Sequence, residues 1–137
     1  MPKTSKDLLE FWEEQMKLSH TSSNYFFRKS PSHYHMMLIV MNSFKRNENL
    51  SVEELKTRLF KTSRPKSALM IKEACEKNFF SLEKKGKDHR KKYVVPTEGF
   101  IQEFGDYLRT LKSLSFWEIS KQSKVEGLKL LKIIYKK

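Results

Sequence analysis

The 137-residue chain has few of the residues from which catalytic loops, disulfides and metal sites are built. It has 4 glycines and no phosphate-cradling Gly-x-x-x-x-Gly-Lys, no dinucleotide-binding glycine set and no Gly-x-Ser-x-Gly elbow. Its single cysteine, Cys75, excludes an internal disulfide, so we expect a small core residue and a reducing cytoplasm. His33 and His35 stand two apart, which on a helix turns them to different sides. We therefore expect no enzyme, no metal and no cofactor.

Acidic residues and long apolar runs are also scarce. The chain has 16 acidic residues against 28 basic ones, which gives a formal net charge of +12. A charge of this size implies an anionic partner, although a solvated lysine-rich face is the alternative interpretation. No stretch approaches the ~20 apolar residues of a membrane span, and no signal peptide is visible at the N-terminus. We expect one compact domain that does not enter a membrane.

The most informative part of the chain lies between residues 50 and 99. Ser51 and Glu54 form a Ser-x-x-Glu capping box that begins a short helix, whose apolar edge is Leu55 and Leu59. A polar break follows, and a second helix is predicted to begin near Ser63 because a proline comes directly afterwards and is accepted in a first helical turn. Two short helices in this order are typical of a helix-turn-helix.

Spacing along the second helix predicts which of its faces is buried. The core face is expected to carry Ala68, Ile71 and Cys75, and the outer face Lys66, Met70 and Lys77. Asn78 is suited to the left-handed conformation that ends a helix. The outer face is therefore the one that would enter a DNA groove.

A β-hairpin is predicted after this helix. Residues 79–82 and 92–95 are short β-prone runs on either side of a charged tip that contains a glycine. The basic residues of this segment are Lys84, Lys85, Lys87, Arg90, Lys91 and Lys92. Their charge is too dense for a protein core and suits a row of phosphates. Thr97 is then expected to cap the next helix, so the hairpin is the wing of a winged helix-turn-helix.

The run Asp88-His89-Arg90, followed by Pro96-Thr97-Glu98-Gly99, resembles the MarR family of bacterial transcriptional regulators over roughly residues 32 to 112. The resemblance implies that Arg90 enters the minor groove and that Asp88 orients it. The chain departs from the family pattern at Pro96, at Asn78, where a glycine commonly stands, and in having no glycine between the two short helices. These departures mark a divergent member.

Base contacts are expected from the start of the recognition helix, because its first turns come closest to the base edges. The candidate residues there are Arg64, Lys66, Ser67 and Met70. The alternative is that Arg64 and Lys66 hold phosphates only. The candidate residues of the wing are Lys84, Lys85, Lys87, Asp88, Arg90, Lys91 and Lys92.

Outside this centre the chain is expected to be helical. Leu8, Leu9, Trp12 and Met16 recur in an amphipathic helix from about residue 6 to 18. Residues 20–32 are expected to form a loop that Tyr25-Phe26-Phe27 anchors on the core, with a ligand pocket as the alternative. The run at 36–41 is apolar on nearly every side and predicts a buried scaffold helix over residues 32–45.

The terminal helices carry more apolar surface than a chain of this size readily buries, which predicts a homodimer. The candidate dimer residues are Trp12, Phe104, Tyr107, Leu108, Leu111, Leu128, Leu131 and Ile134. The resemblance implies that the N- and C-terminal helices pair about a two-fold axis, with folding back on their own core as the alternative. The chain is thus divided into residues 1–31 and 98–137 for dimerisation and residues 32–97 for DNA.

The predicted fold is mainly α with a small β-hairpin wing, a winged helix-turn-helix flanked by dimerisation helices. The first hypothesis is a dimeric, sequence-specific regulator that binds double-stranded DNA. The second is a winged-helix module that docks a protein partner through its aromatic terminal helices, with non-specific affinity for nucleic acid. A third, a nucleic-acid enzyme, is disfavoured because no carboxylate cluster is present. A small-molecule effector of unknown identity stays open.

Overall fold

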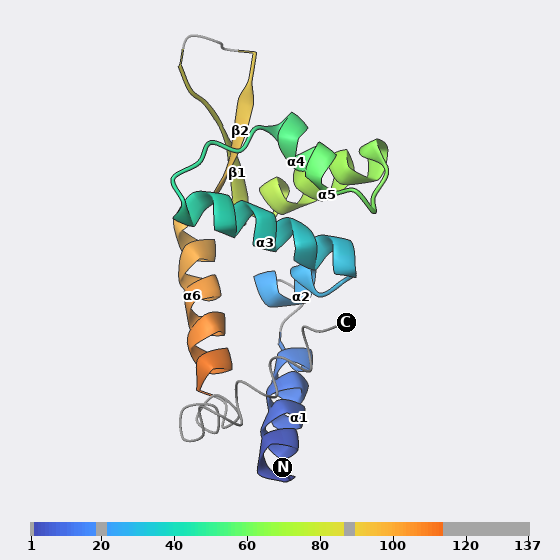
Figure 1. Cartoon of the computed structure of the whole chain (residues 1–137), viewed down its shortest axis with the longest axis vertical. Helices are drawn as coiled ribbons and strands as arrows, with labels where there is room; N and C mark the ends of the chain where they lie inside the picture. Colours follow the sequence, from blue (N-terminus) through green and yellow to red (C-terminus); the bar gives the residue numbers. More distant parts are fainter. Residues whose placement is uncertain (1, 19–21, 87–89, 114–137) are drawn as a thin grey trace, which may run out of the picture. The chain divides into compact units, whose positions relative to one another are not determined.

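The computed structural model describes residues 2–18, 22–86 and 90–113, and it is mainly helical with one antiparallel hairpin (Figure 1). In chain order the elements are α1 (Pro2–Met16), α2 (Ser23–Phe27), α3 (Pro31–Lys45), α4 (Val52–Arg58), α5 (Arg64–Glu76), β1 (Phe80–Lys84), β2 (Lys92–Pro96) and α6 (Glu98–Lys112). Within these ranges no helix is long and apolar enough to cross a membrane. The order confirms the winged helix-turn-helix that the sequence predicts.

The chain divides into two compact units. One consists of Leu18–Phe104, and the other of Met1–Lys17 together with Gly105–Lys137. The first contains α2 to β2 and the first half of α6, and the second contains α1 and the remainder of α6.

Most helices of the larger unit begin at a serine with extended backbone. The hydroxyls of Ser22, Ser30, Ser51 and Ser63 each accept a hydrogen bond from the amide three residues later. Such a bond satisfies an amide that has no partner inside the helix. Thr97 Oγ1 accepts from the Phe100 amide at 3.3 Å in the same way at α6. The predicted caps at Ser51 and Thr97 are therefore confirmed.

A cluster of phenylalanine rings forms the core of the larger unit. Phe27 contacts four others, with its ring centroid 4.9 Å from Phe26, 5.7 Å from Phe79, 5.4 Å from Phe80 and 5.2 Å from Phe100. The cluster joins α2, β1, α6 and the residue that precedes β1. Phe26 and Phe27 are both buried, so the predicted anchoring on the core is confirmed, although they lie in a short helix rather than a loop.

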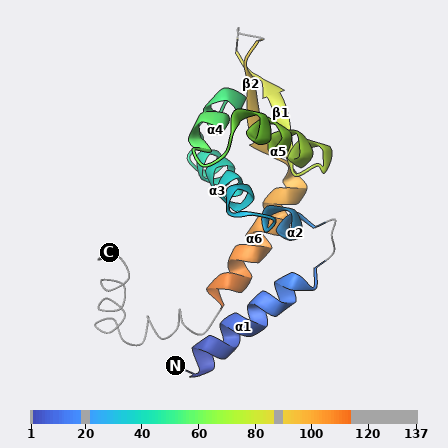
Figure 2. The same ribbon diagram turned by 90° about the vertical axis from the view of Figure 1, so that its right-hand side faces the viewer.

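Helix α3 is the scaffold on which the helix pair is built. It lies against α4 and β2, beneath the pair in both ribbon views (Figures 1 and 2). Its buried apolar residues are Met36, Met37, Ile39, Val40 and Met41. Leu38 is exposed, which leaves the helix with one solvent-facing strip. The predicted buried scaffold helix is thus confirmed, except that the strip containing Leu38 is exposed.

The hairpin has a third partner that the sequence pattern did not predict. In the hairpin itself Leu82 pairs with Val94, and Lys84 with Lys92. The Val94 amide also donates to the Leu50 carbonyl at 2.8 Å, and Ser51 forms an isolated bridge with Tyr93. The residues just before α4 therefore tie the base of the wing to the helix pair.

The smaller unit contains an apolar helix face that stays exposed. In α1 the exposed apolar side chains are Leu8, Leu9, Trp12 and Met16. Another side of α1 packs inside this unit, where Phe11 and Tyr107 have ring centroids 5.9 Å apart. The predicted amphipathic first helix is present, and its apolar stripe faces solvent.

Candidate nucleic-acid interface

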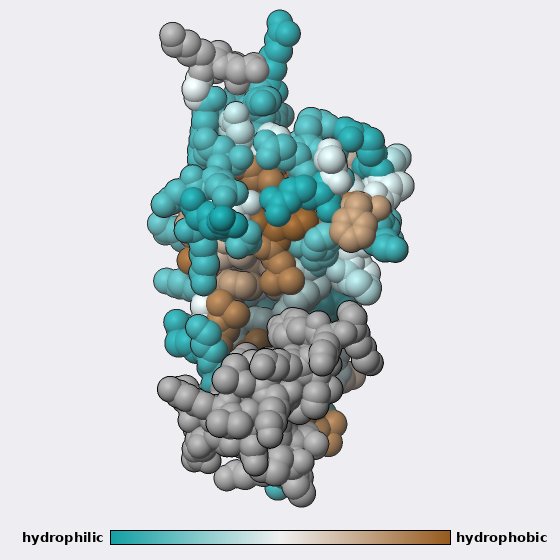
Figure 3. All heavy atoms as spheres, in the orientation of Figure 1, coloured by the Kyte–Doolittle hydropathy of each residue, from teal (hydrophilic) through white to brown (hydrophobic). Residues whose placement is uncertain are grey.

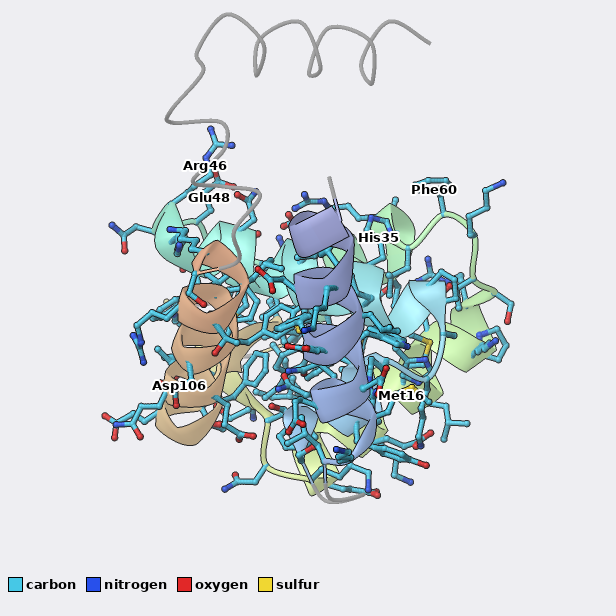
Figure 4. The ribbon with its side chains drawn as sticks, turned by 90° about the horizontal axis from the view of Figure 1, so that it is seen from below. Met16, His35, Arg46, Glu48, Phe60 and Asp106 are labelled. Carbon is cyan, nitrogen blue, oxygen red and sulfur yellow. The ribbon has the colours of Figure 1, made fainter. Side chains whose placement is uncertain are left out.

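The turn between α4 and α5 is held by contacts to α3. Thr62 Oγ1 donates to Ser32 Oγ at 2.8 Å, and the Phe60 ring lies edge-on to His35 with ring centroids 5.6 Å apart. Phe60 and His35 lie near each other in Figure 4. Phe60 itself is 74% exposed. These contacts set the direction in which α5 leaves the turn, so the position of the recognition helix depends on α3.

An acidic side chain of α4 holds the first residue of α5. Arg64 donates to the Glu53 carboxylate, which Lys56 Nζ also approaches at 3.4 Å. These two hydrogen bonds, Arg64 first, lower the pKa of Glu53. Arg64 is exposed but already paired, and it would have to share or leave Glu53 to contact a phosphate.

The face of α5 that turns to the core differs from the predicted one. The buried residues are Ser67, Met70, Ile71 and Ala74, whereas Cys75 is half-buried. Met70 is 2% exposed, so its predicted placement on the outer face is wrong, and Ser67 is 0% exposed. Neither side chain is accessible for the base contact predicted for it. Residues 68–71 are apolar in a row and therefore occupy every side of the helix, which leaves its rotation undecided by spacing.

The outer face of α5 carries Lys66, Leu69 and Lys72. All three side chains are exposed, and spacings of three residues place them on one side of the helix. Leu69 is 55% exposed and is not among the residues predicted to contact bases. The sequence signal that could have identified Leu69 is its spacing, because Lys66 and Lys72 lie three residues before and three residues after it.

The wing presents a row of exposed cations beyond the helix pair. Lys84, Lys85, Arg90, Lys91 and Lys92 are all exposed, whereas the predicted Lys87 and Asp88 lie outside the described residues. Gly86 has φ of 73°, a left-handed value that glycine adopts without strain. Figure 3 shows mainly hydrophilic residues on the hairpin and hydrophobic ones gathered below it.

Local ion pairs occur on the wing and in the segment before α4. Lys85 Nζ lies 3.3 Å from Asn49 Oδ1 and 3.8 Å from a Glu83 carboxylate oxygen. Arg46 and Glu48, which precede α4, form another pair at 3.3 Å (Figure 4). Lys85 is therefore held by neighbouring polar side chains, whereas Lys84 and Lys92 lie opposite each other in the strand register.

Cys75 lines a shallow hollow rather than the core. The hollow has a volume of about 400 Å³ and is bounded by α4, α5 and Leu82 of β1. Burial of the thiol and the nearby Glu76 carboxylate raise the pKa of Cys75. The raised pKa disfavours the thiolate. The prediction of a core cysteine is wrong, because the side chain is only half-buried.

No group of three metal-ligating side chains occurs in the described parts of the chain.

One histidine is buried where α3 begins. Ser30 Oγ lies 2.7 Å from His33 Nδ1, and the Phe26 ring packs edge-on at 5.2 Å. Burial lowers the pKa of His33, Lys29 and Lys66 lower it further, and Glu73 opposes them. The lowered pKa favours the neutral imidazole.

The predicted dimer residues fall into three groups. Trp12 is exposed, and Tyr107, Leu108 and Leu111 are half-buried. Phe104 is buried in its own chain, with its ring 6.0 Å from Phe100, and is therefore not exposed to a second subunit. The C-terminal candidates Leu128, Leu131 and Ile134 lie outside the described residues.

Comparison with known proteins identifies the fold. No protein-family profile matches the chain, and no curated protein sequence does. A solved complex of MepR from S. aureus with DNA is similar over 93% of this chain and 94% of that one, with 12% identity and a TM-score of 0.61. The heme sensor protein PefR, solved with heme and carbon monoxide, is similar over 96% of this chain and 84% of its own, with 15% identity and a TM-score of 0.56. The chain has the winged-helix fold of MarR-type regulators.

Proposed function

We propose that the protein is a sequence-specific DNA-binding transcriptional regulator that acts as a homodimer. The observation that carries the proposal is the pairing of an exposed outer face on α5 with an exposed basic wing on the adjoining hairpin. Helix α5 would lie in the major groove and the wing would contact the backbone and minor groove. The MepR match supports DNA as the partner, because that structure is a DNA complex of the same fold.

Roles within this interface follow from charge and exposure. The wing cations would neutralise phosphates, which position a protein without selecting a sequence. Lys66, exposed in the first turns of α5, would donate to guanine acceptors in the major groove. Arg90 would enter the minor groove, as the resemblance to the MarR family implies.

The dimer part of the proposal is supported by the exposed stripe on α1. Leu8, Leu9 and Met16 on one helix form an apolar surface of the kind that a second subunit covers. The competing hypothesis, a protein-interaction module, would use the same stripe for a different partner. Sedimentation at micromolar concentration separates the two, because only the first predicts a self-associated chain in the absence of other proteins.

Selection from random duplex DNA, followed by titration at several salt concentrations, tests the proposal. Six to ten phosphate contacts would give a log–log salt slope of about −5 to −9. Lys66→Ala should weaken binding to the preferred duplex by about 1 to 3 kcal/mol and should weaken binding to a scrambled duplex much less. Equal losses on both duplexes would make Lys66 a phosphate anchor. A flat salt titration without any preferred sequence would contradict DNA binding itself.

A further inference from the structure

We propose that Leu69 is a specificity-determining residue that recognises the methyl group of a thymine in the major groove. The inference rests on the proposed DNA-binding function and goes beyond it by assigning one base contact to one side chain. It replaces Met70, which is buried and cannot reach a base.

Exposure of Leu69 is the first observation. Among the described residues of α5, Leu69 is the only large hydrophobic side chain that is exposed, and 55% of it is accessible. Its neighbours Met70 and Ile71 fill the core on the other side of the helix. The packing of those two residues fixes the rotation of α5, so Leu69 is directed away from the protein.

The setting of Leu69 is the second observation. Lys66 and Lys72 stand three residues before and after it, on the same side of the helix. Two cations on either side of an apolar side chain match a groove in which phosphates flank the base edges. Isolated exposed leucines are common on protein surfaces, and Leu38 and Leu82 are examples here, but neither lies on the recognition helix.

The chemistry selects thymine among the bases. In the major groove thymine is the only one of the four bases that presents a methyl group. The leucine side chain has no polar atom. Against guanine or cytosine it would displace the water that binds a hydrogen-bonding group of the base and would leave that group without a partner. Contact with a methyl group removes apolar surface from water on both sides.

Deoxyuridine substitution provides the test, because it removes the thymine methyl and leaves every hydrogen-bonding atom in place. The duplex selected by the full chain is titrated at one fixed salt concentration, with each thymine of a half-site replaced singly. We expect one position at which the wild-type chain loses about three- to tenfold in affinity. Leu69→Ala should bind the unmodified duplex with a similar loss and should be indifferent to the replacement.

Leu38→Ala is the matched control, since Leu38 is a leucine of similar exposure, 43%, on α3. It should show the same uracil sensitivity as the wild type. The inference is overturned if the selected site has no thymine, if no replacement matters, or if Leu69→Ala keeps the full sensitivity. In those cases selective, salt-dependent binding by the wild type would still uphold the proposed function. A wild-type chain that prefers no duplex would overturn both.

Discussion

The phenylalanine cluster and the wing lie in the same unit and are built in opposite ways. Phe27, at the centre of the cluster, has four aromatic neighbours with ring centroids within 5.7 Å, and it is fully buried. Lys84 and Lys92, at the end of the hairpin, are exposed, and like charges face each other across the strands. Like-charge pairs directly opposite destabilise a hairpin. We infer that the cluster provides stability and that the wing gives up some of it for ligand contacts.

Substitution in the cluster should have the largest effect. Phe27→Ala removes a buried ring and leaves a cavity, so we expect the free energy of unfolding to fall by about 3 to 5 kcal/mol. Urea denaturation followed by circular dichroism measures it. Phe60→Ala, at a ring that is 74% exposed, is the control and should change stability by less than about 0.5 kcal/mol. Similar values for the two variants would mean that the cluster is not the stabilising core.

Neutralising the charges of the wing should affect DNA binding rather than stability. Replacing Lys84, Lys91 and Lys92 with glutamine removes three phosphate contacts, so the log–log salt slope of DNA binding should become shallower by about 3. The affinities for the preferred and the scrambled duplex should fall by similar factors. A triple variant at Lys6, Lys17 and Lys112 has the same change in charge and should keep the original slope. An unchanged slope in the wing variant would exclude these lysines from the DNA contact.

A smaller effect is expected at Ser67, which is buried on the recognition helix. Its hydroxyl has no hydrogen-bond partner among the described residues. Removal of a buried group of this kind is neutral or stabilising, so Ser67→Ala should raise the free energy of unfolding by up to about 1 kcal/mol. DNA affinity should stay within error in fluorescence anisotropy. A loss confined to the preferred duplex would restore Ser67 as a base contact.

The smallest effect concerns pH. Because burial holds the pKa of His33 below its ordinary 6.5, the unfolded chain binds the proton more readily than the folded one. This contribution to stability is fully present above pH 6.5 and is lost as the pH falls through the lower pKa of the folded chain. Urea midpoints between pH 7.5 and 5 should decline less for His33→Asn than for the wild type. Parallel curves would show that another group causes the decline.

Features that depend on neighbouring residues along the chain could be predicted from sequence. Ser51 and Thr97 were identified as caps, and Asn78 as the residue that ends α5, where its φ of 66° is left-handed. Each of these depends on backbone groups within about one helical turn. The hairpin was found for the same reason, since its two strands and its turn are consecutive.

Features that depend on distant partners could not be predicted in this way. The bond between Val94 and Leu50 and the pairing of Arg64 with Glu53 join residues that no local pattern relates. The error at Met70 has the same origin. Four consecutive apolar residues let α5 adopt any rotation, and only the surrounding core selects one.

The sequence by itself therefore determined the helix pair, the hairpin that follows it, several helix caps and the basic character of the wing, because caps, turns and charge are local properties. Tertiary structure alone decided which residues of α5 face outward, since burial of Met70 and Ile71 sets the rotation of the helix. That rotation exposes Leu69 between two lysines and buries Ser67, and it thereby decides which side chains are available to a ligand.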